Sequence, residues 1–546
     1  MKKLFFIFLI LLFALSSIAQ MPLSFKYTNQ MPEIDHISIN PPNQQTINDE
    51  IALTEKTGTF YRVATLLPVN ANNSNSGTWT YISSNINIWQ LRISCQDAKA
   101  ISIYFDKLDL PANASLYVYS NNREIIDGPY YRYDNPDCDE YMIGNILGDD
   151  ITIELDATTE NADIQIGEIG YVFRDEKGFE KGTRAEFGSS ESCEVNVNCT
   201  VGEPWRIQQR GVARVYVREG WSAGYCTGTL INNTSNDGTP YFLTANHCGP
   251  DATTSNFNQW KFRFNYEADG CTNPSTESAI NYTDITGCTK VAEGAIEGGS
   301  DFYLLRLKNF TTSTAINIGA VYNGWTRATT ATSGEGACIH HPAGDIKKIS
   351  FYTSTPTTGT FSNCISGAHW KIQWYNNGDK TGVTEGGSSG SPIFNSQGLV
   401  FGTLSGGASS CSASTYSRND LYGKFSYHWN NSTNGTTDAY HLQPWLDPQN
   451  TGAMTCPYYD PALVNIESEL TDNISIYPNP TSKLITIEIP EDKAIVKISN
   501  ILGQIVYVTD MTSNIKTISL ENLESGMYFV SVKLSQGTFT NKIIVE

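Results

Sequence analysis

Short runs in which apolar and polar residues alternate dominate most of the chain. Residues 100–105 (AISIYF) and 114–119 (ASLYVY) are examples, and Asn, Gly and Pro residues separate such runs. A period of two places successive side chains on opposite faces of a strand, and turn residues end each strand. Long runs with helical periodicity are absent from the sequence. The pattern predicts an all-β protein whose first folded part, residues 20–184, is sandwich-like.

The chain has 546 residues, which is too long for one typical domain, so we expect several parts. Composition and strand pattern indicate where these parts begin and end. Residues 1–19 carry two lysines, a short apolar core and small residues, which is typical of a secretory signal peptide. Residues 185–460 alternate short strands with Gly, Asn, Ser and Thr turns, which predicts two packed antiparallel barrels. We expect a linker over residues 461–474 and a separate β unit over residues 475–546.

One serine stands between glycines in the run GGSSGSP, residues 386–392. This context predicts Ser389 as a nucleophile, with an oxyanion hole formed by the amides of Gly387 and Ser389. His247 follows an apolar strand and Asp301 precedes another, which makes them the candidate base and its orienting acid. Each context alone is typical of an ordinary loop, cap or turn. Together, in the order His, Asp, Ser, they favour the chemistry of chymotrypsin-like proteases.

Several long segments then identify a family that residues 190–450 resemble, the lysyl endopeptidases, which are secreted bacterial serine proteases. The resemblance implies a chymotrypsin-like double β-barrel and the triad His247, Asp301 and Ser389. The segments are CEVNVNC (193–199), CTGTLINNTSND (226–237), YFLTANHCG (241–249), SDFYLLRL (300–307), IHHPAG (339–344), GVTEGGSSGSPIF (382–394), GGASSCSAS (406–414) and WLDPQNTG (445–452).

Twelve cysteines in an exported chain predict disulfides, because an oxidising exterior lets these bonds persist. The resemblance implies three of them: Cys193 with Cys411, Cys199 with Cys271, and Cys226 with Cys248. Two further cysteines of the first domain are candidates for a fourth bond, Cys95 and Cys138. Four more depart from the family pattern and have no assigned partner: Cys288, Cys338, Cys364 and Cys456.

Substrate selection is expected to depend on Asp420. Trypsin-like enzymes carry an acidic residue six positions before the nucleophile, whereas this chain has Val383 there. The resemblance implies that Asp420 supplies the pocket carboxylate instead and that Ser405 and Gly406 pair with the substrate main chain. Lysyl enzymes of the family have a histidine where this chain has Ser405, so the pocket entrance should be more open. We predict cleavage after Lys, Arg or both.

Two other interpretations stay open, a serine protease of different specificity, such as a glutamyl one, and an inactive protease fold that acts in binding or adhesion.

The way in which the enzyme is kept inactive before processing is also expected to differ from that of trypsin. The residue before the nucleophile is Ser388, so the trypsin-type switch, in which a freed N-terminus pairs with an aspartate at that position, cannot operate. We therefore expect residues 20–184 to be an inhibitory propeptide, with a binding module as the alternative. Lys177, Lys181 and Arg184 are candidate cleavage points.

The last β unit resembles the C-terminal sorting domain of proteins exported by the type IX secretion system, with YPNP at 477–480, GMYFV at 526–530 and KIIV at 542–545. An immunoglobulin-like substrate-binding module is the alternative. The resemblance implies export to the exterior or the cell surface, with the secretion machinery and protein or peptide substrates as partners.

The net charge of -20 excludes a general nucleic-acid-binding surface. No Cys-x-x-Cys pair or similar spacing of metal ligands occurs, so we predict no metal site and no cofactor, with a structural calcium ion left open. We also expect a monomer.

Overall fold

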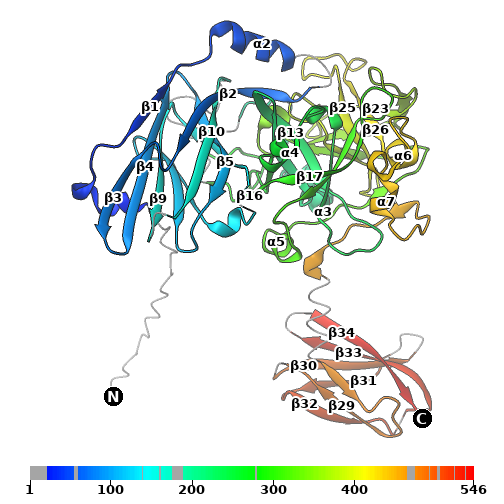
Figure 1. Ribbon diagram of the computed structural model, residues 1–546. Helices are drawn as coiled ribbons and strands as arrows, with labels where there is room; N and C mark the ends of the chain where they lie inside the picture. Colours follow the sequence, from blue (N-terminus) through cyan, green and yellow to red (C-terminus); the bar gives the residue numbers. More distant parts are fainter. Residues whose placement is uncertain are drawn as a thin grey trace, which may run out of the picture.

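The computed structural model describes residues 21–546 except 55–58, 138, 159–160, 175–187, 277–278, 464–473, 491, 501–504, 522 and 535–536. The expected signal peptide and the three candidate cleavage points lie outside the described residues. Strands dominate the described part, which confirms the predicted all-β fold (Figure 1). No described helix is long and apolar enough to cross a membrane.

The N-terminal domain is a β-sandwich, as predicted. One sheet has the strand order β1-β4-β9-β6-β7, with β3 paired to β4, and the facing sheet contains β2, β10, β5 and β8. Alternating apolar side chains of the two sheets, such as Trp89, Ile103 and Ile153, form one core between them. The strands are β1 (His36–Ile39), β2 (Tyr61–Asn72), β3 (Thr78–Ser83), β4 (Ile86–Cys95), β5 (Ala100–Asp109), β6 (Ser115–Ser120), β7 (Ile126–Tyr130), β8 (Tyr141–Leu147), β9 (Asp150–Ala157) and β10 (Asp163–Val172), and the helices are α1 (Leu23–Lys26) and α2 (Gln44–Thr54).

The first barrel follows in the order β16-β15-β12-β13-β14-β18-β17. Its interior is filled by aromatic and aliphatic side chains, among them Phe242, Phe262 and Leu305. The strands are β12 (Val212–Glu219), β13 (Ser222–Leu230), β14 (Tyr241–Thr244), β15 (Lys261–Phe264), β16 (Thr283–Thr286), β17 (Cys288–Gly294) and β18 (Phe302–Leu307), and the helices of this region are α3 (Arg206–Gln209), α4 (Thr254–Asn258) and α5 (Thr312–Asn317).

The second barrel has the order β11-β21-β20-β24-β25-β26-β23-β22, with β19 paired to β25 and to β27. A shared core that includes Phe302, Trp325 and Ile349 packs the two barrels together. The strands are β11 (Val195–Asn196), β19 (Trp325–Thr326), β20 (Gly336–His340), β21 (Lys348–Tyr352), β22 (Thr357–Gly359), β23 (His369–Gln373), β24 (Pro392–Phe394), β25 (Val400–Gly407), β26 (Asn419–Lys424) and β27 (Thr455–Cys456), and the helices are α6 (Phe425–Asn430) and α7 (Gln443–Leu446).

One strand of the sandwich continues the sheet of the first barrel. β2 pairs with β10 on one side, for example Leu67 with Ile169, and with β13 on the other, for example Thr65 with Ser222. An 11-stranded sheet therefore spans the N-terminal domain and the first barrel (Figure 1). This pairing places the start of β2 beside the two-barrel domain.

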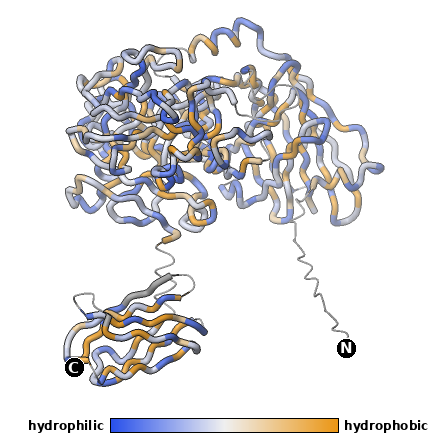
Figure 2. Tube along the Cα trace, turned by 180° about the vertical axis from the view of Figure 1, so that it is seen from behind, coloured by the Kyte–Doolittle hydropathy of each residue, from blue (hydrophilic) through white to orange (hydrophobic). Residues whose placement is uncertain are grey.

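The C-terminal unit is a second sandwich with its own core. Its sheets are β28-β29-β32 and β31-β30-β33-β34. Inward-facing residues such as Ile487, Val496 and Val530 are buried, and Figure 2 shows hydrophobic residues along its strands. The strands are β28 (Ser475–Tyr477), β29 (Leu484–Glu488), β30 (Ala494–Asn500), β31 (Ile505–Met511), β32 (Ile515–Ser519), β33 (Gly526–Leu534) and β34 (Gly537–Val545).

Candidate active site

The predicted base and its orienting acid lie side by side at the ends of two paired strands. β14 pairs with β18 through Thr244 and Tyr303, so the residues just after β14 meet those just before β18. His247 Nδ1 lies 2.7 Å from Asp301 Oδ2, and the backbone amide of His247 donates to Asp301 Oδ1 at 3.0 Å. Both side chains are buried. Because the carboxylate accepts both bonds, it sets the orientation of the imidazole.

The charge of Asp301 is stabilised in spite of its burial. Burial alone would raise the pKa of this carboxyl, but the nearby imidazole and hydrogen bonds from His247 and Ser405 hold the pKa below its ordinary value. Asp301 also has a φ of 64°, a left-handed conformation in which Asp is among the better tolerated residues. Ser405, predicted only as a substrate-binding residue, therefore also contacts the predicted orienting acid. That second contact requires the spatial closeness of β25 and the Asp301 turn, which the sequence pattern does not reveal.

Ser389 lies on a loop of the second barrel that is hydrogen-bonded to the first. The amide of Thr227 on β13 donates to Ser389 O at 2.8 Å, and the Thr227 hydroxyl donates to Gly387 O at 2.8 Å. His247 Nε2, the atom predicted to accept the Ser389 proton, is buried and has no hydrogen-bond partner in the described part of the chain. This nitrogen is free to act as a base, and such bonds commonly tighten only when substrate binds.

The loop before the nucleophile requires glycine at the predicted oxyanion hole. Gly387 has a φ of 92°, and a methyl group added there would lie 2.8 Å from His341 O and 2.9 Å from Gly344 N. A side chain at this position would be strained by both the backbone conformation and the lack of space. The close approach of the two backbone segments explains the glycine.

A cavity of about 320 Å³ joins Ser389 to Asp420, the predicted pocket acid. Ser405 and Gly406 also line it, which brings the predicted substrate-binding residues to one place. The Asp420 carboxylate is buried, and its Oδ2 accepts hydrogen bonds from three side chains that sequence reasoning missed: Trp374 Nε1 at 2.5 Å, Thr384 Oγ1 at 2.7 Å and Ser409 Oγ at 2.5 Å.

Burial raises the pKa of Asp420, and these three hydrogen bonds oppose that rise. The three hydrogen bonds therefore stabilise the charged carboxylate in part. A cationic partner in the pocket would stabilise this charge further. The three donors come from the residue just after β23, the loop before Ser389 and the loop after β25. No local signal in the sequence points to them, because only the barrel brings these segments together.

Residues of the N-terminal domain line the same cavity, among them Tyr61 and Arg174. The Tyr61 ring packs on the nucleophile loop, since a methyl group on Gly386 would lie 2.6 Å from its Cδ2. The Arg174 guanidinium lies 4.3 Å from the centre of that ring, and its Nε donates to Arg62 O at 2.7 Å. The cavity mouth is thus partly built from the domain that precedes the barrels.

The structure contains the disulfides Cys193–Cys411, Cys199–Cys271 and Cys226–Cys248. The third fastens the loop of His247 to β13. Within the described part of the chain, the cysteines without a disulfide are all buried: Cys95, Cys288, Cys338, Cys364 and Cys456. Cys138, the suggested partner of Cys95, lies outside the described residues. Among those residues, no group of three or more His, Cys, Asp or Glu side chains is arranged to hold a metal ion.

Comparison with known proteins assigns the two-barrel region. Residues 187–423 match the model of the lysyl endopeptidase C-terminal domain. This part of the chain is thus similar to the lysyl endopeptidases. A lysyl endopeptidase from Pseudomonas aeruginosa is 30% identical over 292 residues, which are 52% of this chain and 60% of that protein. The chain thus spans less than two thirds of the length of this relative.

Two solved structures are also similar. A thermostable serine protease from an extremophilic microorganism covers 42% of this chain and 100% of its own, with 16% identity and a TM-score of 0.28. A protease from Arthrobacter nicotinovorans covers 42% of this chain and 92% of its own, with 16% identity and a TM-score of 0.28.

Residues 475–546 match the model of the secretion system C-terminal sorting domain. The sorting domain directs the chain to secretion or to the cell surface, as predicted.

Proposed function

We propose that this chain is a secreted serine endopeptidase that hydrolyses peptide bonds after Lys or Arg. The observation that carries the proposal is the cavity in which Ser389 and the buried carboxylate of Asp420 occur together. The match of residues 187–423 to the lysyl endopeptidase model supports the same reaction class. A basic substrate side chain would enter this cavity with its cationic end toward Asp420 and its carbonyl carbon near Ser389.

In the proposed mechanism, Ser389 attacks the substrate carbonyl while His247 Nε2 takes its proton. Asp301 keeps the imidazole in the tautomer that presents Nε2 and stabilises the imidazolium through its Nδ1, at 2.7 Å. The amides of Gly387 and Ser389 donate to the oxyanion of the tetrahedral intermediate. His247 then gives the proton to the leaving amine, and water hydrolyses the acyl enzyme by the same steps.

The proposed selectivity has an electrostatic cause. A Lys or Arg side chain pairs with a carboxylate by charge-assisted hydrogen bonds, whereas Glu would be repelled and an apolar side chain would leave the charge unpaired. Ser405 and Gly406 on β25 would pair with the substrate main chain as an added strand. Since Ser405 carries a small side chain, the entrance accommodates the planar guanidinium as well as an ammonium.

The proposed catalytic role of Ser389 is tested by reacting the processed secreted protein with a fluorophosphonate probe, which labels an active serine nucleophile. Labelling should be lost in Ser389→Ala, and Lys-amide and Arg-amide substrates should be cleaved by the unmodified protein alone. A wild-type protein that is not labelled would leave only the binding interpretation. Labelling combined with cleavage after Glu or large apolar residues would retain the protease and reject the role of Asp420.

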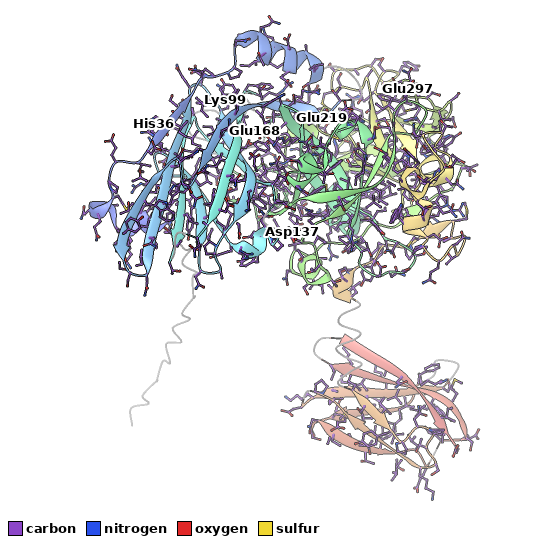
Figure 3. All side chains as sticks on the ribbon, in the orientation of Figure 1. His36, Lys99, Asp137, Glu168, Glu219 and Glu297 are labelled. Atoms are coloured by element: carbon purple, nitrogen blue, oxygen red, sulfur yellow. A yellow bond between two sulfur atoms is a disulfide. The ribbon has the colours of Figure 1, made fainter. Side chains whose placement is uncertain are left out.

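We further propose that the N-terminal domain is a propeptide that blocks the cleft. Strand β2 pairs with β13, and Tyr61 and Arg174 line the substrate cavity. A partly buried ion pair, Arg218 with Glu168 at 2.8 Å, joins the first barrel to the sandwich. Figure 3 marks Glu168 and Glu219 where the two meet. A recombinant 20–546 precursor should therefore gain activity only on cleavage, and full activity of the intact precursor would reject this role.

A further inference from the structure

The residue that precedes the nucleophile has an unusual partner in this protein. Ser388 is fully buried, and its Oγ lies 2.7 Å from Nδ1 of His340, which is the last residue of β20. The amide of Glu385 donates to the same Oγ at 3.2 Å. Ser388 therefore links its own loop to a buried imidazole of the second barrel.

The other ring nitrogen of His340 continues the chain of hydrogen bonds back to the same loop. His340 Nε2 lies 2.9 Å from Ser350 Oγ, and Ser350 Oγ donates to Val383 O at 2.8 Å. The path from Glu385 through Ser388, His340 and Ser350 to Val383 thus starts and ends on the segment before Ser389. One imidazole bridges both ends of this segment, residues 383–388, which we call the oxyanion loop.

The donors and acceptors of this path allow one consistent direction. Ser350 Oγ donates to Val383 O at 2.8 Å, and Glu194 Oε2 is a more distant acceptor at 3.4 Å. Either bond uses the hydroxyl proton, so the Ser350 oxygen accepts from His340 Nε2–H. His340 Nδ1 then carries no proton and accepts from the Ser388 hydroxyl, whose oxygen in turn accepts the amide of Glu385. Every group in the path has its partner, and the arrangement requires a neutral imidazole.

The surroundings of His340 favour that neutral form. Burial, together with the smaller effect of the nearby Lys348 charge, lowers the pKa of His340 to about 3. Glu194 is the acidic group closest to the ring, with Oε2 3.5 Å from Nε2. Burial and the neighbouring Glu385 raise the pKa of Glu194 well above its ordinary value, which favours the uncharged form of this carboxyl.

We propose that His340 is a positioning residue for the oxyanion hole. Its hydrogen bonds hold the oxyanion loop in the conformation that forms the hole, without help from a freed N-terminus. The inference rests on the proposed function. In enzymes of the trypsin type, an ion pair made by the new N-terminus orders this loop after cleavage. Here the bonds of Ser388 and Ser350 to His340 replace that ion pair. Gly387 lies inside the loop, so its amide is oriented before any processing.

The decisive variant is His340→Leu, compared with His340→Asn. Leu removes both hydrogen bonds, whereas the Asn side-chain oxygen can still accept from Ser388. Kinetics are measured on processed protein with a Lys-amide substrate, and the active fraction is determined by titration with the phosphonate probe. We expect kcat per active site to fall about 100-fold in His340→Leu with KM changed less than about threefold, as for a lost oxyanion-hole donor. His340→Asn should retain kcat within about tenfold of wild type.

Ile339→Ala on the same strand controls for damage to the core. Ile339 is buried between the barrels, so this variant should lose thermal stability and keep its kcat per active site. If His340→Leu does not fold, Ser388→Ala provides the test, with an expected loss of about tenfold in kcat. Wild-type kcat in His340→Leu or Ser388→Ala, or an equal kcat loss in Ile339→Ala, would overturn the inference. An inactive wild type would instead refute the proposed function.

Discussion

Replacing Asp420 by Asn tests the proposed pocket with almost no change of shape. Oδ2 of the carboxylate accepts bonds from three side chains, whereas among the described residues Oδ1 accepts only from the Ser409 amide, at 3.3 Å. Oδ1 is therefore the oxygen with capacity for a substrate cation. In Asp420→Asn, the amide oxygen must take the place of Oδ2 to satisfy the three donors. The NH₂ group then points toward the substrate, so the variant replaces an attraction by a repulsion.

The expected loss follows from the burial of the site. Removing one partner of a buried charge pair costs about 3 to 5 kcal/mol, which corresponds to about a 150- to 5,000-fold decrease in kcat/KM for Lys and Arg substrates. A substrate with an uncharged side chain at the cleavage position should change by less than about threefold, because it never pairs with the carboxylate. Ser409→Ala is the matched control, since it removes one donor and keeps the charge. Its loss should be at most about tenfold.

The assay compares kcat/KM for matched Lys-, Arg-, Gln- and Glu-amide substrates in wild type, Asp420→Asn and Ser409→Ala, each corrected for the fraction labelled at Ser389. A decrease shared equally by charged and uncharged substrates would show damage to the catalytic apparatus. Unchanged cleavage after Lys and Arg in Asp420→Asn would refute the assignment of the pocket.

Two further predictions concern stability. Replacing Cys226 and Cys248 by Ala opens a loop with a sequence separation of 22 and should lower the free energy of unfolding by about 3 kcal/mol. Because this loop carries His247, kcat should fall too, whereas removing Cys199–Cys271 should lower only stability; equal effects on kcat would contradict this reasoning. His428 is buried between Ser300 Oγ (2.7 Å) and Thr403 Oγ1 (3.0 Å), and burial lowers its pKa to about 3. Its neutral form stabilises the fold fully above pH 6.5, and as the pH falls toward 3 this contribution decreases by about 1.4 kcal/mol per unit. The stability advantage of wild type over His428→Gln, measured by urea unfolding, should therefore shrink by about 2 kcal/mol between pH 7.5 and 5, and a constant difference would exclude this titration.

The strand content and the division into sandwiches and barrels were accessible from the sequence because both depend on local properties. Period-two alternation sets which side chains a strand buries, and Gly, Asn and Pro end the strands. The immediate sequence contexts of His247, Asp301 and Ser389 were accessible for the same reason, because each residue lies at a strand end or a tight turn. The family resemblance, rather than any local pattern, indicated Asp420 as the pocket carboxylate.

The partners of these residues were not accessible, because they come from segments far apart in the chain. Trp374 and Ser409 reach Asp420 from different parts of the second barrel, and Ser405 reaches Asp301 across the two barrels. The pairing of β2 with β13, which brings Tyr61 into the cavity, also joins two domains. No periodicity encodes such contacts.

Ser388 shows what the sequence determines by itself and what only the tertiary structure determines. The sequence by itself determined that the trypsin-type ion pair is impossible, since a hydroxyl cannot carry the required negative charge. Only the tertiary structure decided what replaces it, because His340 is 48 residues away and is placed beside Ser388 by the closure of the second barrel. Local patterns specify which side chains are present at a turn, whereas long-range strand pairing specifies which buried groups satisfy them.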